Sequence, residues 1–135
     1  MSTAFTITHN IEVAHRLTLL PGKCQQIHGH SMLVTLAAEG DVDEAGLIAG
    51  LDFGAAKRAF REHLDITYDH RLLLNCKDEL AELHLPGAQL VTGDPTVENI
   101  ARWIGEWAVA QFPQLHAHGV KVQETRTNSV IWNAG

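Results

Sequence analysis

The sequence predicts an α+β domain in which two helices cover one face of a four-stranded antiparallel sheet. Alternating apolar and polar residues near both ends of the chain indicate two pairs of strands, and apolar residues at helical spacing between them indicate two helices. The expected order is therefore strand, strand, helix, helix, strand, strand. The chain has 135 residues, of which 45% are hydrophobic, and we expect one domain over residues 1–135.

The first two strands are expected to form an antiparallel pair. From Phe5 to His15, the odd positions place mostly apolar side chains on one face of a strand. A second strand is predicted from Ile27 to Ala38, with its even positions on one face. The segment Leu-Pro-Gly-Lys at residues 20–23 supplies turn chemistry between the two strands.

The two helices are expected after an acidic, glycine-rich loop at residues 40–50. Asp52 is the predicted cap of the first helix, whose apolar residues recur at helical spacing as far as Leu64. Thr96 is the predicted cap of the second helix. The apolar stripe of this second helix contains Ile100, Trp103, Ile104, Trp107 and Phe112.

Two regions remain, the segment between the two helices and the C-terminal part of the chain. Residues 68–75 have no clear assignment, and residues 78–83 indicate a brief helical turn. Val120 to Thr125 and Val130 to Trp132 alternate as strands around a turn near Asn128, so they predict a hairpin.

The composition argues against nucleic acid as a partner. The formal net charge is −6 at pH 7, and the ten Lys and Arg residues are scattered rather than gathered in a basic stripe. No run of about 18 apolar residues predicts a membrane-spanning helix, and the first residues do not resemble a secretory signal. We therefore expect a soluble, cytoplasmic protein without a membrane partner, in which Cys24 and Cys76 are free thiols.

Three histidines are expected to converge at one end of the first strand pair. His28 and His30 flank a glycine within the second strand, so both rings lie on one face. His15 ends the first strand, also on its apolar face. Three imidazoles can fill three tetrahedral positions of Zn²⁺ and leave the fourth for water or substrate. Iron, copper and nickel also accept imidazole ligands, so the residues alone leave the metal open.

Cys24 lies four residues before His28, in the turn that leads into the second strand. A thiol close to a divalent cation and imidazoles gains thiolate character. The spacing leaves two roles open for it. It could be a fourth ligand that closes a structural site, or a base or nucleophile beside an open one.

Three further groups of polar residues have both a structural and a functional interpretation. Asp69-His70 could be an ordinary turn pair or a proton relay, since a carboxylate can orient an imidazole. Glu124 shares a strand face with core residues, so its carboxylate either reaches water at the strand end or binds the N–H edge of a guanine-like ring. Thr96, Glu98 and Asn99 either cap the second helix or line a ligand pocket.

Together these residues resemble the family of 6-pyruvoyltetrahydropterin and 6-carboxytetrahydropterin synthases. The similarity runs along nearly the whole chain and is most specific in the Cys-x-x-x-His-Gly-His motif from Cys24 to His30, with Ala-His upstream at His15. It continues through Leu51-Asp52-Phe53, Asp69-His70, Pro95-Thr96-Val97-Glu98-Asn99 and Glu124-Thr125.

The resemblance implies a role for each matching residue. His15, His28 and His30 would bind the catalytic zinc, and Cys24 would be the proton acceptor. The relay would be completed by His70, held by Asp69. The pterin ring would be anchored by Glu124, with Thr96 and Glu98 near the same pocket.

The resemblance also implies the tunnelling fold, in which subunits join their sheets into a barrel, commonly as a hexamer of two trimers. Active sites would lie between subunits, so Cys24 and His70 can come from different chains. The family substrate is 7,8-dihydroneopterin triphosphate. Arg16, Lys23 and Arg71 are the candidate cations for its triphosphate.

The short chain and the compact spacing from Cys24 to His28 resemble the bacterial carboxy type more closely. That type forms 6-carboxy-5,6,7,8-tetrahydropterin for 7-deazaguanine (queuosine-type) synthesis and releases triphosphate and acetaldehyde. The alternatives are a 6-pyruvoyltetrahydropterin synthase or an aldolase-like relative that cleaves the same side chain. From other classes, the sequence also admits a non-catalytic zinc-binding assembly module closed by Cys24, or a histidine-metal hydrolase or oxygenase.

Overall fold

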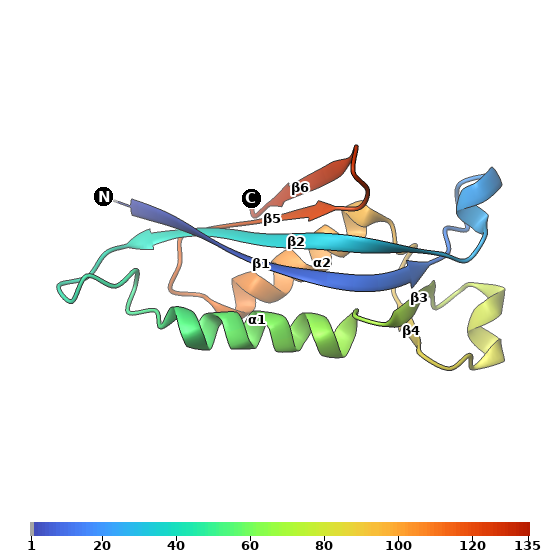
Figure 1. Ribbon diagram of the computed structural model, residues 1–135, viewed down its shortest axis with the longest axis horizontal. Helices are drawn as coiled ribbons and strands as arrows, with labels where there is room; N and C mark the ends of the chain where they lie inside the picture. The colour runs from blue at the N-terminus through green and yellow to red at the C-terminus, as the bar shows by residue number, and fades with distance from the viewer. Residues whose placement is uncertain (1) are drawn as a thin grey trace.

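The computed structural model describes residues 2–135, which form one twisted sheet with both helices on the same face (Figure 1). Within this range, six strands lie in the order β4-β3-β1-β2-β5-β6. The strands are β1 (Ser2–His15), β2 (His28–Asp41), β3 (Arg71–Asn75), β4 (Ala88–Val91), β5 (Ala117–Gln123) and β6 (Ser129–Asn133). The helices are α1 (Phe53–Thr67) and α2 (Val97–Gln111), and two 3-10 turns are η1 (Gly22–Gln25) and η2 (Glu79–Leu83).

The long antiparallel pair β1–β2 forms the centre of the sheet, as predicted. Its register runs from Ser2 opposite Asp41 to His15 opposite His28, so both strands are longer than the alternation alone indicated. The predicted C-terminal hairpin β5–β6 is also present, and it joins the sheet through antiparallel pairing of β5 with β2.

The prediction of a purely antiparallel four-stranded sheet is wrong in detail, because β3 and β4 extend the sheet beyond β1. Both strands pair parallel, β3 with β1 and β4 with β3. They contain only five and four residues, and the apolar residues Leu72, Leu73 and Leu74 of β3 are consecutive, which does not distinguish a strand from a buried helix segment. A parallel partner is reached through a crossover, here the helix α1, and a local sequence pattern does not reveal that pairing.

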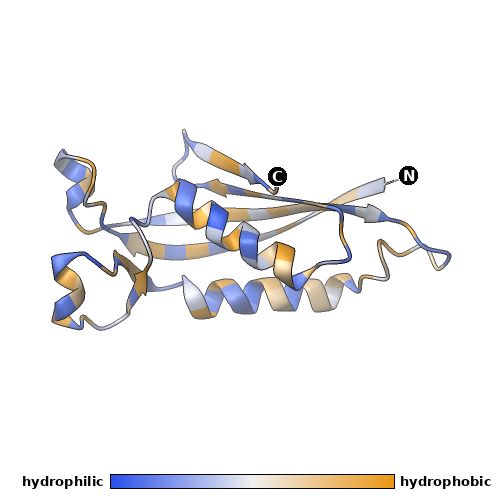
Figure 2. Cartoon of the chain, turned by 180° about the vertical axis from the view of Figure 1, so that it is seen from behind, coloured by the Kyte–Doolittle hydropathy of each residue, from blue (hydrophilic) through white to orange (hydrophobic). Residues whose placement is uncertain are grey.

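Both predicted helix caps are present. The Asp52 carboxylate accepts a hydrogen bond from the Gly54 N–H, and the Thr96 hydroxyl accepts one from the Asn99 N–H. The ribbons of the two helices alternate between hydrophilic and hydrophobic residues (Figure 2), because each helix buries one stripe against the sheet. Neither helix, nor any other in residues 2–135, is long and apolar enough to cross a membrane.

The two faces of the sheet have different surroundings. The helix-covered face holds the apolar core, in which Phe60 of α1 and Ile104 of α2 are fully buried. The opposite face carries exposed residues such as Thr6 and Thr8 of β1 and Lys121 of β5. The buried strand residues include Ile7, Ile11, Val13, Met32, Val34, Leu36, Val120 and Val122. One face of the sheet is therefore left without a covering layer in a single chain.

Candidate functional site

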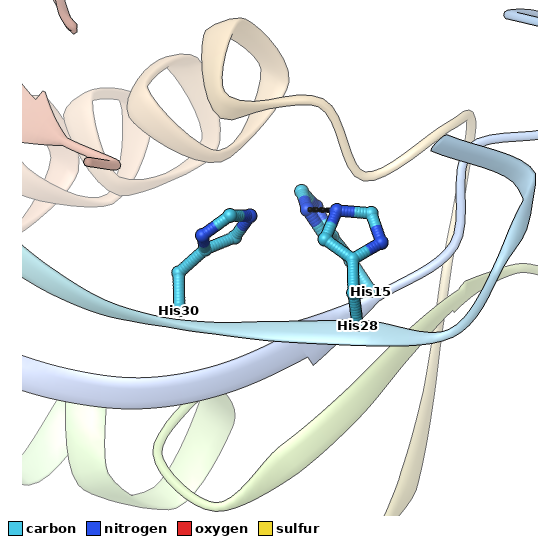
Figure 3. Close-up of side chains that lie close together, drawn as sticks. All are labelled: His15, His28 and His30. Carbon is cyan, nitrogen blue, oxygen red and sulfur yellow. Dashed lines mark hydrogen bonds between the residues drawn. The ribbon is translucent and has the colours of Figure 1, made fainter. Parts of the chain in front are cut away.

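The three predicted histidines come together where β1 ends and β2 begins (Figure 3). The antiparallel register sets His15 opposite His28 and Val13 opposite His30, so all three rings lie on the helix-covered face. Their ligand nitrogens are all within 4.8 Å of one another. His15 is fully buried, whereas His28 and His30 are partly exposed, so the cluster lies at the edge of the core and opens toward solvent.

Backbone carbonyls orient two of these rings. His15 Nδ1 donates to the Pro95 carbonyl oxygen at 2.7 Å, and His28 Nδ1 donates to the Gln26 carbonyl oxygen at 2.8 Å. Because a carbonyl only accepts, each neutral ring presents an Nε2 lone pair on its other side. These two Nε2 atoms face each other at 3.0 Å.

The arrangement of lone pairs fits a bound cation. Two facing lone pairs repel each other unless a proton or a metal ion lies between them. The buried His30 Nε2 has no hydrogen-bond partner among residues 2–135. Burial lowers the pKa of His15, and the neighbouring His28 adds to this effect against the opposing Pro95 carbonyl and Glu124. Burial therefore favours the neutral form of His15, the form that ligates a metal.

Glu124 directly follows β5 and directs its carboxylate toward the histidines. Its Oε2 lies 3.8 Å from His15 Nε2 and 3.9 Å from His30 Nε2. Its Oε1 accepts a hydrogen bond from Asn128 Nδ2 across the turn between β5 and β6. Only 18% of the Glu124 side chain is exposed. The carboxylate is thus held beside the cluster, with one oxygen free of hydrogen bonds from described residues.

Asp69 and His70 form a second pair on the turn between α1 and β3. His70 Nδ1 donates to Asp69 Oδ2 at 2.8 Å, and Asp69 Oδ1 accepts from the Glu12 N–H at 2.7 Å. Partial burial alone would raise the pKa of Asp69, but the hydrogen bonds from Glu12 and His70 outweigh it and lower the pKa. Asp69 therefore stays ionised and fixes the orientation of the His70 ring.

The Asp69–His70 pair and the histidine cluster lie on different faces of the sheet. The His70 side chain is 78% exposed and lines a groove of about 450 Å³ with Glu12, Ala14 and Ser31. These residues alternate along β1 and β2 with the core residues, so they belong to the uncovered face. His30 also borders this groove, but its ring lies against those of His15 and His28, which do not line the groove.

Comparison with known proteins assigns the chain to a family. A family model described as 6-pyruvoyl tetrahydropterin synthase matches residues 4–134. The chain belongs to this family. A 6-carboxy-5,6,7,8-tetrahydropterin synthase of Rickettsia bellii is 33% identical over 97 residues, 67% of this chain and 68% of the relative. The synthase of the same name from Rickettsia typhi is 30% identical over 99 residues, 68% of this chain and 70% of the relative.

A solved structure confirms the fold of this tetrahydropterin synthase family. The 6-pyruvoyl tetrahydropterin synthase of Plasmodium vivax superposes with a TM-score of 0.80 and 16% sequence identity, over 99% of this chain and 98% of that chain. The α+β class and the arrangement of two helices on one face are therefore shared. In residues 2–135 of this chain, the helices cover a six-stranded sheet with both parallel and antiparallel pairing.

Cys24 lies apart from the histidine cluster in this structure. It is half-buried in the 3-10 turn η1, between the ends of β1 and β2. Among residues 2–135, the group of side chains close enough to share a metal ion contains three imidazoles and no thiol. This geometry favours the open site over the closed one that the sequence also allowed. Cys24 and Cys76 are both free thiols.

Thr96 and Glu98 are seen in their structural roles at the start of α2. The Thr96 hydroxyl caps the helix, and Glu98 is exposed in the first turn, where its charge is favourable. The preceding residue, Pro95, supplies the carbonyl that orients His15. Thr96 is therefore one residue from a direct contact with the cluster, while no contact of described residues brings Glu98 to it.

Sequence reasoning missed two buried carboxylates near the site, Asp78 and Asp94. Asp78 pairs with Arg16, whose Nη1 lies 2.6 Å from Asp78 Oδ1. Because this guanidinium is committed to Asp78, with Glu79 close by, it is a poor candidate for a triphosphate contact. Asp94 lies between a glycine and a proline, a pattern typical of a turn that gives no sign of burial.

Proposed function

We propose that this chain converts 7,8-dihydroneopterin triphosphate to 6-carboxy-5,6,7,8-tetrahydropterin and releases triphosphate and acetaldehyde. The observation that carries the proposal is the cluster of three converging imidazoles with the Glu124 carboxylate beside it. The carboxy product is chosen because the 30–33% identical bacterial relatives carry that name. The product would serve 7-deazaguanine synthesis of the queuosine type.

The metal in this proposal is zinc, held by His15, His28 and His30. Three imidazole ligands with an open fourth position are typical of catalytic zinc, which supplies Lewis acidity to substrate oxygens. The carbonyls of Pro95 and Gln26 fix two of the rings through their Nδ1 atoms. The fold thus orients these two imidazoles before a metal ion or a substrate binds.

Three side chains are proposed to move protons or hold the substrate. Cys24 is the proton acceptor, His70 is the second acid–base group, and Asp69 keeps His70 oriented through their 2.8 Å hydrogen bond. Glu124 is proposed to act at the same centre. One of its oxygens is held by Asn128, and the other is available to a substrate N–H or to a transferred proton.

The pterin pocket is proposed to extend from Glu124 toward the start of α2, where Thr96 and Glu98 would line it. This part of the proposal rests on their place in the Pro-Thr-x-Glu-Asn segment beside Pro95.

We also propose that the working protein is a homo-oligomer, a hexamer formed by two trimers in which sheets join into a barrel, located in the cytoplasm. The support is the uncovered sheet face and the position of His70 on it. A neighbouring chain would bring its Asp69–His70 pair to the cluster of the first, so each active site would draw residues from two chains.

The deciding experiment is incubation of the zinc-loaded protein with dihydroneopterin triphosphate, followed by mass spectrometry of the pterin and an assay for acetaldehyde. The 6-carboxy product with equal amounts of acetaldehyde is expected. A pyruvoyl pterin without acetaldehyde would instead identify a 6-pyruvoyltetrahydropterin synthase. That alternative is the activity named in the description of the family model.

A further inference from the structure

Asp94 is a buried carboxylate that the proposed chemistry does not use. It is only 4% exposed and accepts four hydrogen bonds. Its Oδ2 accepts from the Thr18 and Leu19 N–H groups at 2.8 and 2.9 Å. Its Oδ1 accepts from Thr18 Oγ1 at 2.8 Å and from Asn75 Nδ2 at 3.1 Å. Its carboxylate therefore joins three segments that are far apart in the chain.

One of those segments is the loop that carries Cys24. It begins directly after the metal ligand His15, and the Leu17 N–H donates to the Cys24 carbonyl at 2.9 Å, which closes the loop on itself. The loop and the segment between β3 and β4 project from the same end of the molecule (Figure 1). Asp94 connects the base of this loop to the body of the protein.

Apolar packing does little to hold the tip of this loop. Leu19 and Leu20 are 81% and 49% exposed, so their side chains contribute little burial free energy. Leu17 is buried at the start of the loop, and beyond it polar contacts carry the attachment. Besides those to Asp94, Arg16 donates through Nε to the Gln25 carbonyl and through Nη1 to Asp78.

Asp94 also precedes the carbonyl that orients the metal ligand His15. The Asp94 backbone carbonyl accepts from the Thr96 N–H and from Asn99 Nδ2, each at 2.8 Å. Pro95 lies between these contacts, and its carbonyl accepts from His15 Nδ1. Fixing Asp94 therefore fixes Pro95 on one side and the Cys24 loop on the other.

We propose that Asp94 is a positioning residue that locks the Cys24 loop and the His15 ligand into one rigid unit. This inference deepens the proposed function and rests on it for the roles of Cys24 and zinc. Asp94 acts only through other groups: the Thr18 and Leu19 amides hold the loop, and the Pro95 carbonyl holds the ring of His15. Charge-assisted bonds to backbone N–H groups are stronger than neutral ones, which suits a carboxylate to this position.

The test compares Asp94→Ala with Asp94→Asn in a Cys76→Ser background, so that Cys24 is the only thiol. Ala removes all four hydrogen bonds, whereas Asn keeps one acceptor oxygen for the Thr18 and Leu19 amides. We expect Asp94→Ala to lower zinc affinity about tenfold or more, measured by chelator competition, as loss of support behind a metal ligand does. Asp94→Asn should recover most of this loss.

Loop release is measured without any activity assay. In Asp94→Ala, alkylation of Cys24 by iodoacetamide should be faster at a pH where the thiol is fully ionised, because access then limits the rate. Amide hydrogen exchange of Thr18 and Leu19 should also be faster. Asp94→Asn should lie close to the parent protein in both measurements.

The matched control is Asp43→Ala, at the opposite end of the molecule. The Asp43 carboxylate likewise accepts from two backbone N–H groups, those of Ala45 and Leu47. It should leave zinc affinity and Cys24 alkylation unchanged. The proposal is overturned if folded Asp94→Ala matches the parent in both measurements, or if Asp43→Ala changes them equally. If Asp94→Ala does not fold, Asp94→Asn and Thr18→Val provide the test. The proposal is supported if Asp94→Asn matches the parent in zinc affinity, alkylation and exchange while Thr18→Val shows faster alkylation of Cys24. It is overturned if alkylation in Thr18→Val is unchanged.

Turnover separates this proposal from the proposed function. With dihydroneopterin triphosphate, Asp94→Ala should lower kcat more than it changes KM, because substrate-binding groups stay in place. If the parent protein itself forms no tetrahydropterin, the proposed function fails. The zinc, alkylation and exchange measurements would still decide whether Asp94 holds the loop.

Discussion

His30 differs from the other two clustered histidines because its Nε2 is buried and has no hydrogen-bond partner in the described part of the chain. A polar atom in that condition costs free energy unless something binds it. His30→Ala should therefore reduce bound zinc well below one ion per chain after dialysis, measured by elemental analysis. His116→Ala, which removes a half-exposed imidazole elsewhere, should hold as much zinc as the parent. Equal zinc in His30→Ala and the parent would contradict the metal site.

Cys24 decides between the catalytic and the assembly hypotheses. Since the cluster of potential ligands contains no thiol, Cys24→Ala should retain zinc and the same oligomeric state. Turnover should fall by about 100-fold or more, the usual contribution of an acid–base group. Cys76→Ala is the control, because Cys76 is exposed and outside the site. If Cys24→Ala loses zinc and folding together, the closed structural site is correct.

At the scale of single residues, the sequence predicts those whose spacing carries chemistry. His15, His28 and His30 follow from strand alternation, which sets the direction of every second side chain. Asp94 and Asp78 could not be predicted, because their burial depends on partners such as Thr18 and Arg16, which are more than 60 residues away. The place of Glu124 beside the histidines likewise required the pairing of β5 with β2.

At the scale of elements, α2 packs closely against β6 because residue 105 of the helix is a glycine. A Cβ on Gly105 would overlap the ring of Trp132, so only glycine lets helix and strand approach this closely. Gly105→Ala should lower the unfolding free energy by about 1–3 kcal/mol, as overpacking does. Without the clash, the same change would raise it by about 1 kcal/mol through helix propensity. Chemical denaturation therefore tests the contact through the sign of the change in unfolding free energy. Glu106→Ala, at an exposed position of the same helix, is the control.

The contact between α1 and α2 contains a half-buried, stacked histidine. The His63 ring lies parallel to the Trp107 ring with 4.4 Å between their centroids, and its buried Nε2 has no hydrogen-bond partner among the described residues. Burial lowers the pKa of His63 below 6.5. As pH falls through 6.5, the unfolded chain takes up a proton before the folded one, so stability decreases.

Replacement of that histidine should reduce the sensitivity to acid. His63→Phe retains an aromatic ring for stacking but removes the titrating group. Between pH 8 and pH 5, it should lose less unfolding free energy than the parent in urea titrations. His116→Phe should lose as much as the parent. If the unfolding free energy of His63→Phe depends on pH as that of the parent does, His63 does not contribute to the loss of stability in acid.

Elements with a long hydrophobic pattern or with recognisable capping residues are predicted by the sequence, whereas the short strands are not. α1 and α2 were predicted with their caps Asp52 and Thr96, because capping is local chemistry. The strands β3 and β4 were missed because their pairing is fixed by tertiary contacts rather than by alternation. Their parallel direction depends on where α1 returns the chain, which no local signal specifies.

At the scale of the whole molecule, the uncovered sheet face and the position of His70 on it predict active sites shared between chains. Cys24→Ala and His70→Ala should each be inactive alone. After the two are unfolded together and refolded as a mixture, activity should return to about one quarter of the parent value if chains assemble at random. Each variant refolded alone is the control. A mixture that stays inactive would place both residues of a site in one chain.

The orientation of His15 by Pro95 has a consequence for the order in which the protein matures. Ligand and carbonyl are separated by 80 residues, and Glu124 joins the centre from still further along the chain. The His15 ring therefore acquires its final direction only after the chain has been synthesised beyond Pro95. We expect metal to enter a fold that has already formed, unlike small zinc domains in which the ion drives folding. Apoprotein should accordingly be a stable species, ready for loading.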